Sequence, residues 1–207
     1  MSISKVRVVK VGGSLLDMPN LGQRLASWLS AQPPAVNLLV VGGGGLVNAV
    51  RDLDSKHHFD AEFIHWQCVD LLDKTSAIFD ELLPRSLEHR LIRQREELSS
   101  YLDSYDKQSS SLAVVSPAAF YARGGSEEVL PSSWDTTTDS ISAFLAMSIS
   151  AAELVLLKSA APPSAENVEY GGAEHWTELA EHGYVDASFP RIASCVKKIR
   201  CVNFRGF

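Results

Sequence analysis

Short apolar runs alternate along this chain with segments in which apolar residues recur at helical spacing. The runs are rich in valine, isoleucine and leucine and end at glycine, proline or polar residues, a pattern typical of strands that are covered on both faces. They lie at residues 6–11, 37–41, 112–115, 153–159 and 199–204. The helical spacing predicts helices within residues 21–30, 46–53, 61–83, 138–149, 173–181 and 192–196.

Strands that alternate with helices predict an α/β fold, because parallel strands in one sheet need a crossover that is usually helical. We therefore expect a three-layer α/β/α sandwich around a largely parallel sheet. Residues 1–207, of which 45% are hydrophobic, can build a sizeable core, and we expect them to form a single domain. Two stretches break the alternation: the charged residues 84–108 predict a solvated helix and loop, and residues 123–128 an exposed turn.

The charge and the composition narrow the classes of partner. The formal net charge is −6 and the isoelectric point is about 5.5, which argues against nucleic acid or an anionic membrane as the main partner, because both favour basic surfaces. The chain enters its first strand without an apolar targeting segment, and no apolar run is long enough to span a membrane, so we expect a cytoplasmic protein. Histidines and cysteines lack metal-ligand spacing, and we expect no metal site built from the protein.

Two glycine turns follow the first two strands. The first contains Gly12, Gly13 and Ser14, and the second contains Gly42, Gly43 and Gly44 before a helical pattern begins. Bare amide groups at a strand exit, together with the positive end of a helix dipole, favour a phosphate or a developing negative charge. Neither turn matches the dinucleotide-binding or P-loop pattern. The alternative interpretation is a flexible loop that binds nothing.

Two lysines and one aspartate are placed to join these turns. Lys10 and Lys158 lie near the carboxyl ends of their strands, and Asp139 lies at the start of a helix. Because ligands of parallel sheets bind outside the carboxyl ends of the strands, we expect the three side chains to converge there. Such a set suits phosphoryl transfer, which needs positioned cations and amide dipoles. The alternatives are exposed edge lysines and a helix cap formed by Thr138 or Asp139.

Together these motifs resemble those of the amino acid kinase superfamily. Its members share a Lys-x-Gly-Gly-Ser first strand, matched here by residues 10–14, a second glycine-rich strand exit, an aspartate at a helix start and a later lysine. The pair at 65–66 and the strings at 134–140 and 156–159 are most similar to the aminomethylfuran phosphate kinase-like branch. That branch phosphorylates a furanmethyl phosphate to its diphosphate in tetrahydromethanopterin biosynthesis.

The resemblance implies an ATP-dependent kinase with an amino acid kinase-like fold, a small phosphate-bearing acceptor, magnesium carried on the phosphates of ATP, and a homodimer. It implies that Lys10 contacts the transferring phosphate, that Lys158 stabilises the leaving oxygens and that Asp139 organises both lysines. The glycines of the two turns supply amide donors. Three further residues are expected to face the acceptor: His65, Trp134 and Asp135.

Two other functions stay open at this point. One is a kinase of the same fold that acts on an amino acid carboxylate or on another small phosphate or phosphonate. The other is a catalytically lapsed subunit that only binds a nucleotide or another ligand. The second is motivated by residues 159–163, Ser-Ala-Ala-Pro-Pro, which stand where family members continue with an Asp-Gly segment that begins the nucleotide pocket. Trp134 is compatible with ordinary core packing, and His65 with a helix histidine whose hydrogen bonds are satisfied.

Overall fold

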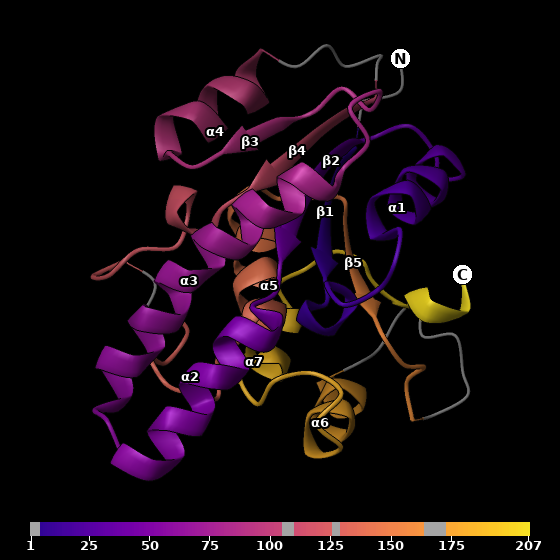
Figure 1. Ribbon diagram of the computed structural model, residues 1–207. Helices are drawn as coiled ribbons and strands as arrows, with labels where there is room; N and C mark the ends of the chain where they lie inside the picture. Colours follow the sequence, from indigo (N-terminus) through magenta and orange to yellow (C-terminus); the bar gives the residue numbers. More distant parts are fainter. Residues whose placement is uncertain (1–4, 105–109, 126–128, 164–172) are drawn as a thin grey trace.

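A parallel sheet forms the middle layer of the protein (Figure 1). The computed structural model describes residues 5–104, 110–125, 129–163 and 173–207. In these ranges six strands pair in the order β3-β4-β2-β1-β5-β6, every pair parallel. The strands are β1 (Val6–Val11), β2 (Val36–Val41), β3 (Arg90–Ile92), β4 (Ser111–Val115), β5 (Glu153–Lys158) and β6 (Ile199–Asn203).

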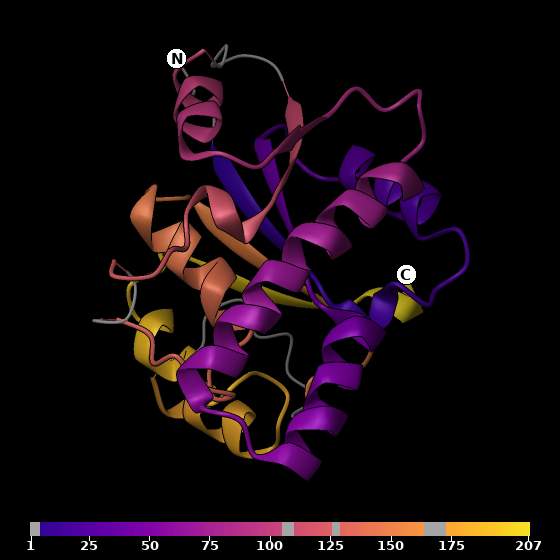
Figure 2. The same ribbon diagram turned by 60° about the vertical axis from the view of Figure 1, so that its left-hand side comes forward.

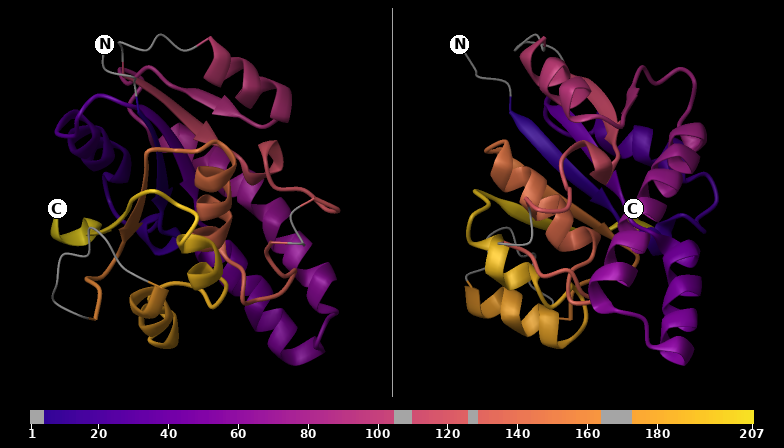
Figure 3. Two further views of the ribbon diagram at one scale, coloured as in Figure 1. Left: turned by 180° about the vertical axis from the view of Figure 1, so that it is seen from behind. Right: turned by 90° about the vertical axis from the view of Figure 1, so that its left-hand side faces the viewer.

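Helices cover both faces of this sheet, so the predicted α/β/α sandwich is confirmed (Figure 2). The right-hand view of Figure 3 places α5, α6 and α7 on one side of the sheet and α1 on the other. The helices are α1 (Leu21–Ser30), α2 (Gly44–His57), α3 (Ala61–Leu82), α4 (Arg95–Asp103), α5 (Thr138–Ser148), α6 (Ala173–Glu181) and α7 (Phe189–Ala193). Single turns of 3-10 helix lie at η1 (Gly13–Leu15), η2 (Pro117–Ala119) and η3 (Phe204–Gly206).

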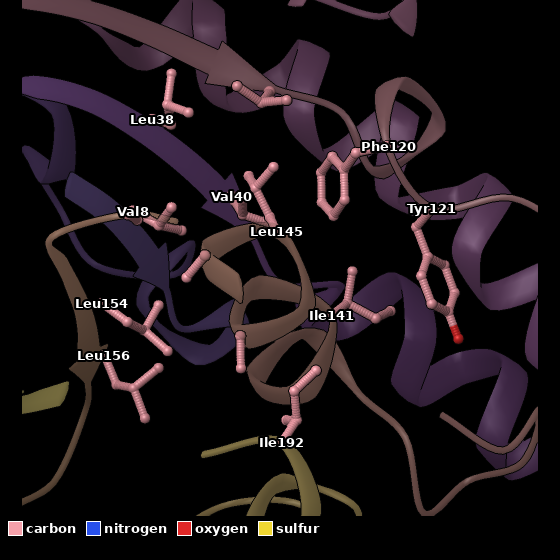
Figure 4. Packing of buried hydrophobic residues seen from close by; sticks show 14 of the residues in the cluster. Val8, Leu38, Val40, Phe120, Tyr121, Ile141, Leu145, Leu154, Leu156 and Ile192 are labelled. Atoms are coloured by element: carbon pink, nitrogen blue, oxygen red, sulfur yellow. The ribbon is translucent and has the colours of Figure 1, made fainter. Parts of the chain in front are cut away.

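The alternation of side chains along the strands decides which face each lysine occupies. In β1, Val8 belongs to the buried cluster under α5, whereas Val9 and Val11 belong to the cluster that contains the buried residues of α1. In β5, Leu156 belongs to the α5 cluster as well, and Figure 4 shows Val8 and Leu156 on the same side as Ile141 of α5. Since side chains two residues apart share a face, Lys10 and Lys158 both lie on the α5 side.

Some predicted boundaries differ from the structure. Residues 84–108 contain the helix α4, but they also contain the strand β3, which the sequence pattern did not predict and which forms the edge of the sheet beside β4. Three residues flanked by charge are too few for a period to appear, although charge is common beside edge strands. The last helix begins at Phe189 and ends at Ala193, earlier than the predicted 192–196, because Pro190 in the first turn favours a helix start.

Parts of three internal segments lie outside the described residues. Residues 123–125 form the predicted exposed turn, whereas 126–128 are outside. Residues 105–108 of the charged stretch are also outside, as is most of the loop between β5 and α6, residues 164–172. Among the helices of the described ranges, none has both the length and the apolar character that a membrane crossing requires.

Candidate active site

Asp139 joins the two lysines at the carboxyl rim of the sheet. Nζ of Lys10 lies 2.9 Å from Oδ1 of Asp139, and Nζ of Lys158 donates a hydrogen bond of 2.6 Å to Oδ2. The three side chains are 7%, 13% and 6% exposed for Lys10, Lys158 and Asp139. The neighbouring strands β1 and β5 deliver the lysines, and α5 delivers the aspartate, so the three predicted residues meet in one place.

Burial and charge set the ionisation of this bridge. Burial alone raises the pKa of Asp139, but the ammonium groups of Lys10 and Lys158 outweigh it and lower the pKa to about 2. Burial lowers the pKa of Lys10, the charge of Lys158 lowers it further, and the carboxylate of Asp139 opposes both effects. With both lysines protonated, the bridge carries one positive charge in excess and can attract an anion.

A second buried carboxylate, Asp186, holds the start of α5. Its Oδ2 accepts hydrogen bonds from the backbone N–H and the hydroxyl of Thr137 and from the backbone N–H of Ser140, and its Oδ1 accepts from the Ser140 hydroxyl. The first amides of a helix lack partners inside the helix, and a carboxylate satisfies them well. Burial first, and then the nearby charge of Asp139, raise the pKa of Asp186.

This arrangement corrects the predicted helix cap. The N-cap residue is Thr137 rather than Thr138 or Asp139, and its hydroxyl bonds to Asp186 instead of to its own helix. Lys158 is tied to the same loop, because its Nζ donates a hydrogen bond of 2.6 Å to the carbonyl of Tyr184. Asp186 therefore positions Asp139 through the helix that carries it, a role that the sequence analysis missed.

The two glycine turns pack against each other beside the bridge. A Cβ atom on Gly13 would lie 2.3 Å from the amide nitrogen of Gly44, and one on Gly42 would lie 2.6 Å from the amide nitrogen of Gly13. Gly44 also has a φ of +53°, which favours glycine. Side chains at these positions would push the two turns apart, so glycine is required by contact as well as by conformation.

The amides of these turns divide into two groups. The N–H groups of Gly12 and Gly42 donate to the carbonyls of Leu157 and Val11 and are used inside the fold. Within the described part of the chain, the amides of Gly13, Gly43 and Gly44 have no backbone acceptor. They lie at the first turn of η1 and of α2, where amides are free to bind an anion. The hydroxyl of Ser14 donates to that of Ser159 at 2.9 Å.

A small cavity lies next to Gly43, between α2, α3 and the segment that leads into α5. Its volume is about 50 Å³, and its lining includes His65 and Trp134. The ring nitrogens of His65 lie 3.1 Å from the carbonyl of Ser133 and 3.2 Å from the hydroxyl of Tyr121. A neutral imidazole satisfies both contacts when Nδ1 donates and Nε2 accepts, so the hydrogen bonds of His65 are satisfied.

Helix α2 supplies two charged partners of Trp134. The indole Nε1 donates a hydrogen bond of 2.6 Å to Asp54, and the guanidinium carbon of Arg51 lies 4.5 Å from the centre of the indole ring. Asp135, the third predicted acceptor residue, is exposed and is absent from the lining of the cavity. Sequence reasoning missed Arg51 and Asp54, although their helical spacing from the cavity residue Val47 places all three on one face of α2.

Comparisons with known proteins place this geometry in context. No protein-family model and no curated protein sequence matches the chain. Among solved structures, uridylate kinase from Archaeoglobus fulgidus has a TM-score of 0.61 at 15% identity, over 97% of this chain and 93% of that one. UMP kinase from Bacillus anthracis has a TM-score of 0.64 at 13% identity, over 98% and 88%. The chain has the amino acid kinase-like fold.

The same fold occurs in a longer protein, N-acetylglutamate synthase from Neisseria gonorrhoeae, which matches with a TM-score of 0.55 at 17% identity. There the alignment covers 98% of this chain but 55% of the other. At identities this low, the structural similarity shows the amino acid kinase-like fold alone. The activity has to be argued from the site itself. Within this fold, β1, β5 and α5 build the rim that holds the lysine bridge.

Proposed function

We propose that this chain is an ATP-dependent small-molecule kinase that transfers the γ-phosphoryl group of ATP to a phosphate-bearing acceptor. The observation that carries the proposal is the buried bridge of Lys10, Asp139 and Lys158 beside two glycine turns with free amides. A migrating phosphoryl group spreads negative charge over its equatorial oxygens, and fixed cations and amide dipoles stabilise that charge without reorganising.

Each member of the bridge has a distinct role in the proposed reaction. An oxygen of the acceptor attacks the γ-phosphorus, the bond to the oxygen that bridges the β and γ phosphates breaks, and ADP leaves with the electron pair. Lys10 stabilises the transferring group, Lys158 stabilises the leaving oxygens, and Asp139 keeps both ammonium groups directed at the rim. The amides of Gly13, Gly43 and Gly44 bind the phosphate oxygens.

The acceptor oxygen must arrive ionised. A phosphate monoester is largely a dianion at neutral pH, so no proton has to be removed before attack. The groups near the site agree with this: the carboxylate of Asp139 is held by two ammonium groups and that of Asp186 by four donors. Both ring nitrogens of His65 are in hydrogen bonds as well. Because those groups are occupied, the proposal needs no general base.

For the acceptor, we infer a ring-bearing phosphate, and specifically an aminomethylfuran-methyl phosphate of tetrahydromethanopterin biosynthesis. Trp134 supplies a flat surface for the ring, Arg51 a cation for the acceptor's own phosphate, and Asp54 or Asp135 a carboxylate for the aminomethyl cation. Two of the compared structures are named for UMP or uridylate, which is also a phosphate monoester. The resemblance at residues 134–140 supports the furan compound in particular.

The cavity must open before a ring can enter. Its volume of about 50 Å³ is well below the roughly 150 Å³ of a protein cavity that holds benzene. Helix α2 forms one wall, and none of its fourteen residues is buried; Val47 packs against the buried core, but the part of the helix beyond it can move outward with little loss of apolar contact. We therefore expect α2 to shift when the acceptor binds.

Magnesium is placed on the phosphates of ATP in this proposal, because the Asp139 carboxylate is already held by two ammonium groups. Across the described residues, no group of three or more His, Cys, Asp or Glu side chains is arranged to hold a metal ion. Residues 159–163 stand in place of the Asp-Gly segment of family members, so the calorimetric measurement of ATP binding described below is the test of the adenosine contacts. The homodimer and the cytoplasmic location stay predictions.

A product assay tests the proposal. The purified chain is incubated with magnesium and ATP and, in turn, an aminomethylfuran-methyl phosphate, UMP and N-acetylglutamate, and phosphorus NMR identifies the product. We expect a diphosphate from the furan compound, and a loss of turnover of about a hundredfold or more in Lys10→Met. Lys74→Met, which removes an exposed lysine of α3, is the matched control.

Three outcomes change the assignment. A product from UMP or N-acetylglutamate alone replaces the acceptor but keeps the kinase. ATP binding without any product supports the lapsed subunit. Absence of ATP binding by the intact chain, measured by calorimetry, removes the kinase proposal.

A further inference from the structure

A second cluster of cations lies at the amino ends of the strands, at the end of the sheet opposite the lysine bridge. Nε of Arg7 donates a hydrogen bond of 2.8 Å to Glu153, and Nε of Arg200 donates one of 3.2 Å to the other oxygen of the same carboxylate. Nζ of Lys198 lies 3.4 Å from that oxygen. These residues and Lys5 line a cavity of about 320 Å³ that also contacts Gln32 and the proline pair after α1.

The charges around this cavity do not balance. Among the described residues that line it, four are cations and one is a carboxylate, so the local charge is +3 in a chain whose net charge is −6. Burial opposes the ionisation of Glu153, but the hydrogen bond from Arg7 and the charges of Arg200, Arg7 and Lys198 outweigh it and lower its pKa. One arginine would suffice to neutralise Glu153, and Lys198 makes a further contact, so the positive charge of the second arginine and of Lys5 is left for a bound anion to neutralise.

The arginines keep donors for such an anion. The side chain of Arg7 is 7% exposed, and besides its bond to Glu153 it donates one N–H from each terminal nitrogen, to Asn37 and to the carbonyl of Pro33. A guanidinium has five N–H donors, so with these described partners two remain. Arg200 uses Nε and one N–H to Gln32, which leaves three.

This cavity is separate from the lysine bridge. On β1, Arg7 lies at the amino end and Lys10 near the carboxyl end, and an odd spacing places their side chains on opposite faces. Arg200 lies on the α1 side, where its guanidinium carbon is 5.6 Å from the centre of the Trp28 ring. Trp28 is a buried residue of α1, so its indole reports on this cavity rather than on the catalytic rim.

We propose that this cavity binds a compact multivalent anion, a phosphate or diphosphate group carried by a small metabolite. Arginine forks match the oxygens of phosphate, and an excess of more than one positive charge favours a multivalent group over a single carboxylate. The inference does not depend on the proposed kinase activity, because it rests on residues at the amino ends of the strands and on the other face of the sheet.

The test uses inorganic pyrophosphate and the indole N–H signals of the labelled full chain in two-dimensional NMR, assigned by Trp→Phe substitutions. As pyrophosphate is added, we expect the indole N–H signal of Trp28 to shift and then to reach a plateau. We expect Lys198→Gln to raise the Kd for pyrophosphate by about fivefold, which is the effect of removing one unit charge about 4 Å from the anion in a solvent-screened site. Lys197→Gln is the matched control, because it removes an exposed lysine one position away that does not line the cavity.

Lys10→Met separates this site from the catalytic rim. It leaves the Trp28 titration unchanged, whatever it does to turnover. A Trp28 signal that stays fixed at millimolar pyrophosphate overturns the proposal. An equal loss of affinity for pyrophosphate in Lys197→Gln and Lys198→Gln overturns it as well, because it indicates diffuse attraction by surface charge. A titration abolished by Lys10→Met overturns it as well, because the anion then binds at the rim.

Discussion

Replacing Asp139 by asparagine tests the bridge through stability. Asp139→Asn keeps the size of the side chain but leaves two ammonium groups buried at one point, both previously within 2.9 Å of a carboxylate oxygen. The asparagine carbonyl can accept from one lysine, but its NH₂ group then faces the other. Removing one partner of a buried ion pair costs about 3–5 kcal/mol, a large part of the 5–15 kcal/mol typical of a folded protein.

Adding Lys10→Met distinguishes the charge effect from a loss of contacts. In the double variant Lys10→Met/Asp139→Asn only the ammonium of Lys158 remains, and methionine fills much of the space of the lysine stem. The repulsion between the two cations is gone, so the double variant should unfold at higher denaturant than Asp139→Asn alone. Lys10→Met alone keeps the pair of Asp139 with Lys158 and should change stability by no more than about 1 kcal/mol.

Urea unfolding followed by circular dichroism measures all three variants. Asp70→Asn, which changes an exposed aspartate of α3, is the control and should stay within about 0.5 kcal/mol of the unmodified chain. If the double variant is less stable than Asp139→Asn, the losses of the two single variants add, and repulsion between the two ammonium groups is not what destabilises Asp139→Asn.

Three further predictions follow from the same region. The pKa of Asp139 is about 2 in the folded chain and 3.8 ordinarily, so its ionised form adds about 2 kcal/mol to the free energy of unfolding. This contribution is complete above pH 3.8 and is lost as the pH falls toward 2. Acid unfolding of Asp139→Asn should lack this loss. Gly13→Ala should destabilise the chain by more than about 2 kcal/mol because its Cβ meets the Gly44 amide, whereas Gly45→Ala, with nothing within 4 Å, should stabilise it by about 0.5 kcal/mol; thermal unfolding compares the two. Trp134→Phe should raise the KM for the acceptor several-fold and leave the KM for ATP unchanged in steady-state assays, because the ring stays but its hydrogen bond to Asp54 is lost.

Local patterns predicted much of the fold. The predicted strand at 6–11 and the predicted helices at 21–30 and 173–181 match β1, α1 and α6 in the structure. The two glycine turns were also predictable, because glycines that follow directly after an apolar run indicate a tight turn at the end of a strand. The rule that ligands of parallel sheets bind at the carboxyl ends of the strands then predicted that Lys10 and Lys158 approach each other, whereas the register that places them on one face, Lys10 opposite Leu156, came only from the structure.

Contacts between distant segments were outside the reach of local patterns. Asp186 bonds to Ser140 across 46 positions, and nothing in its neighbourhood distinguishes it from a surface loop residue. The strand β3 is stabilised by its pairing with β4 rather than by its own three residues. The cations at the amino edge belong to separate strands, and only the sheet order brings Arg7 and Arg200 to one carboxylate.

A crystal structure of the chain with magnesium, ADP and a planar aluminium fluoride, which mimics the phosphoryl group during transfer, shows whether the lysine bridge binds that group. We expect the mimic to lie within hydrogen-bond distance of Nζ of Lys10, of Nζ of Lys158 and of the amides of Gly13 and Gly44. A mimic bound away from the two lysines, with the bridge to Asp139 unchanged and facing no ligand, contradicts this expectation.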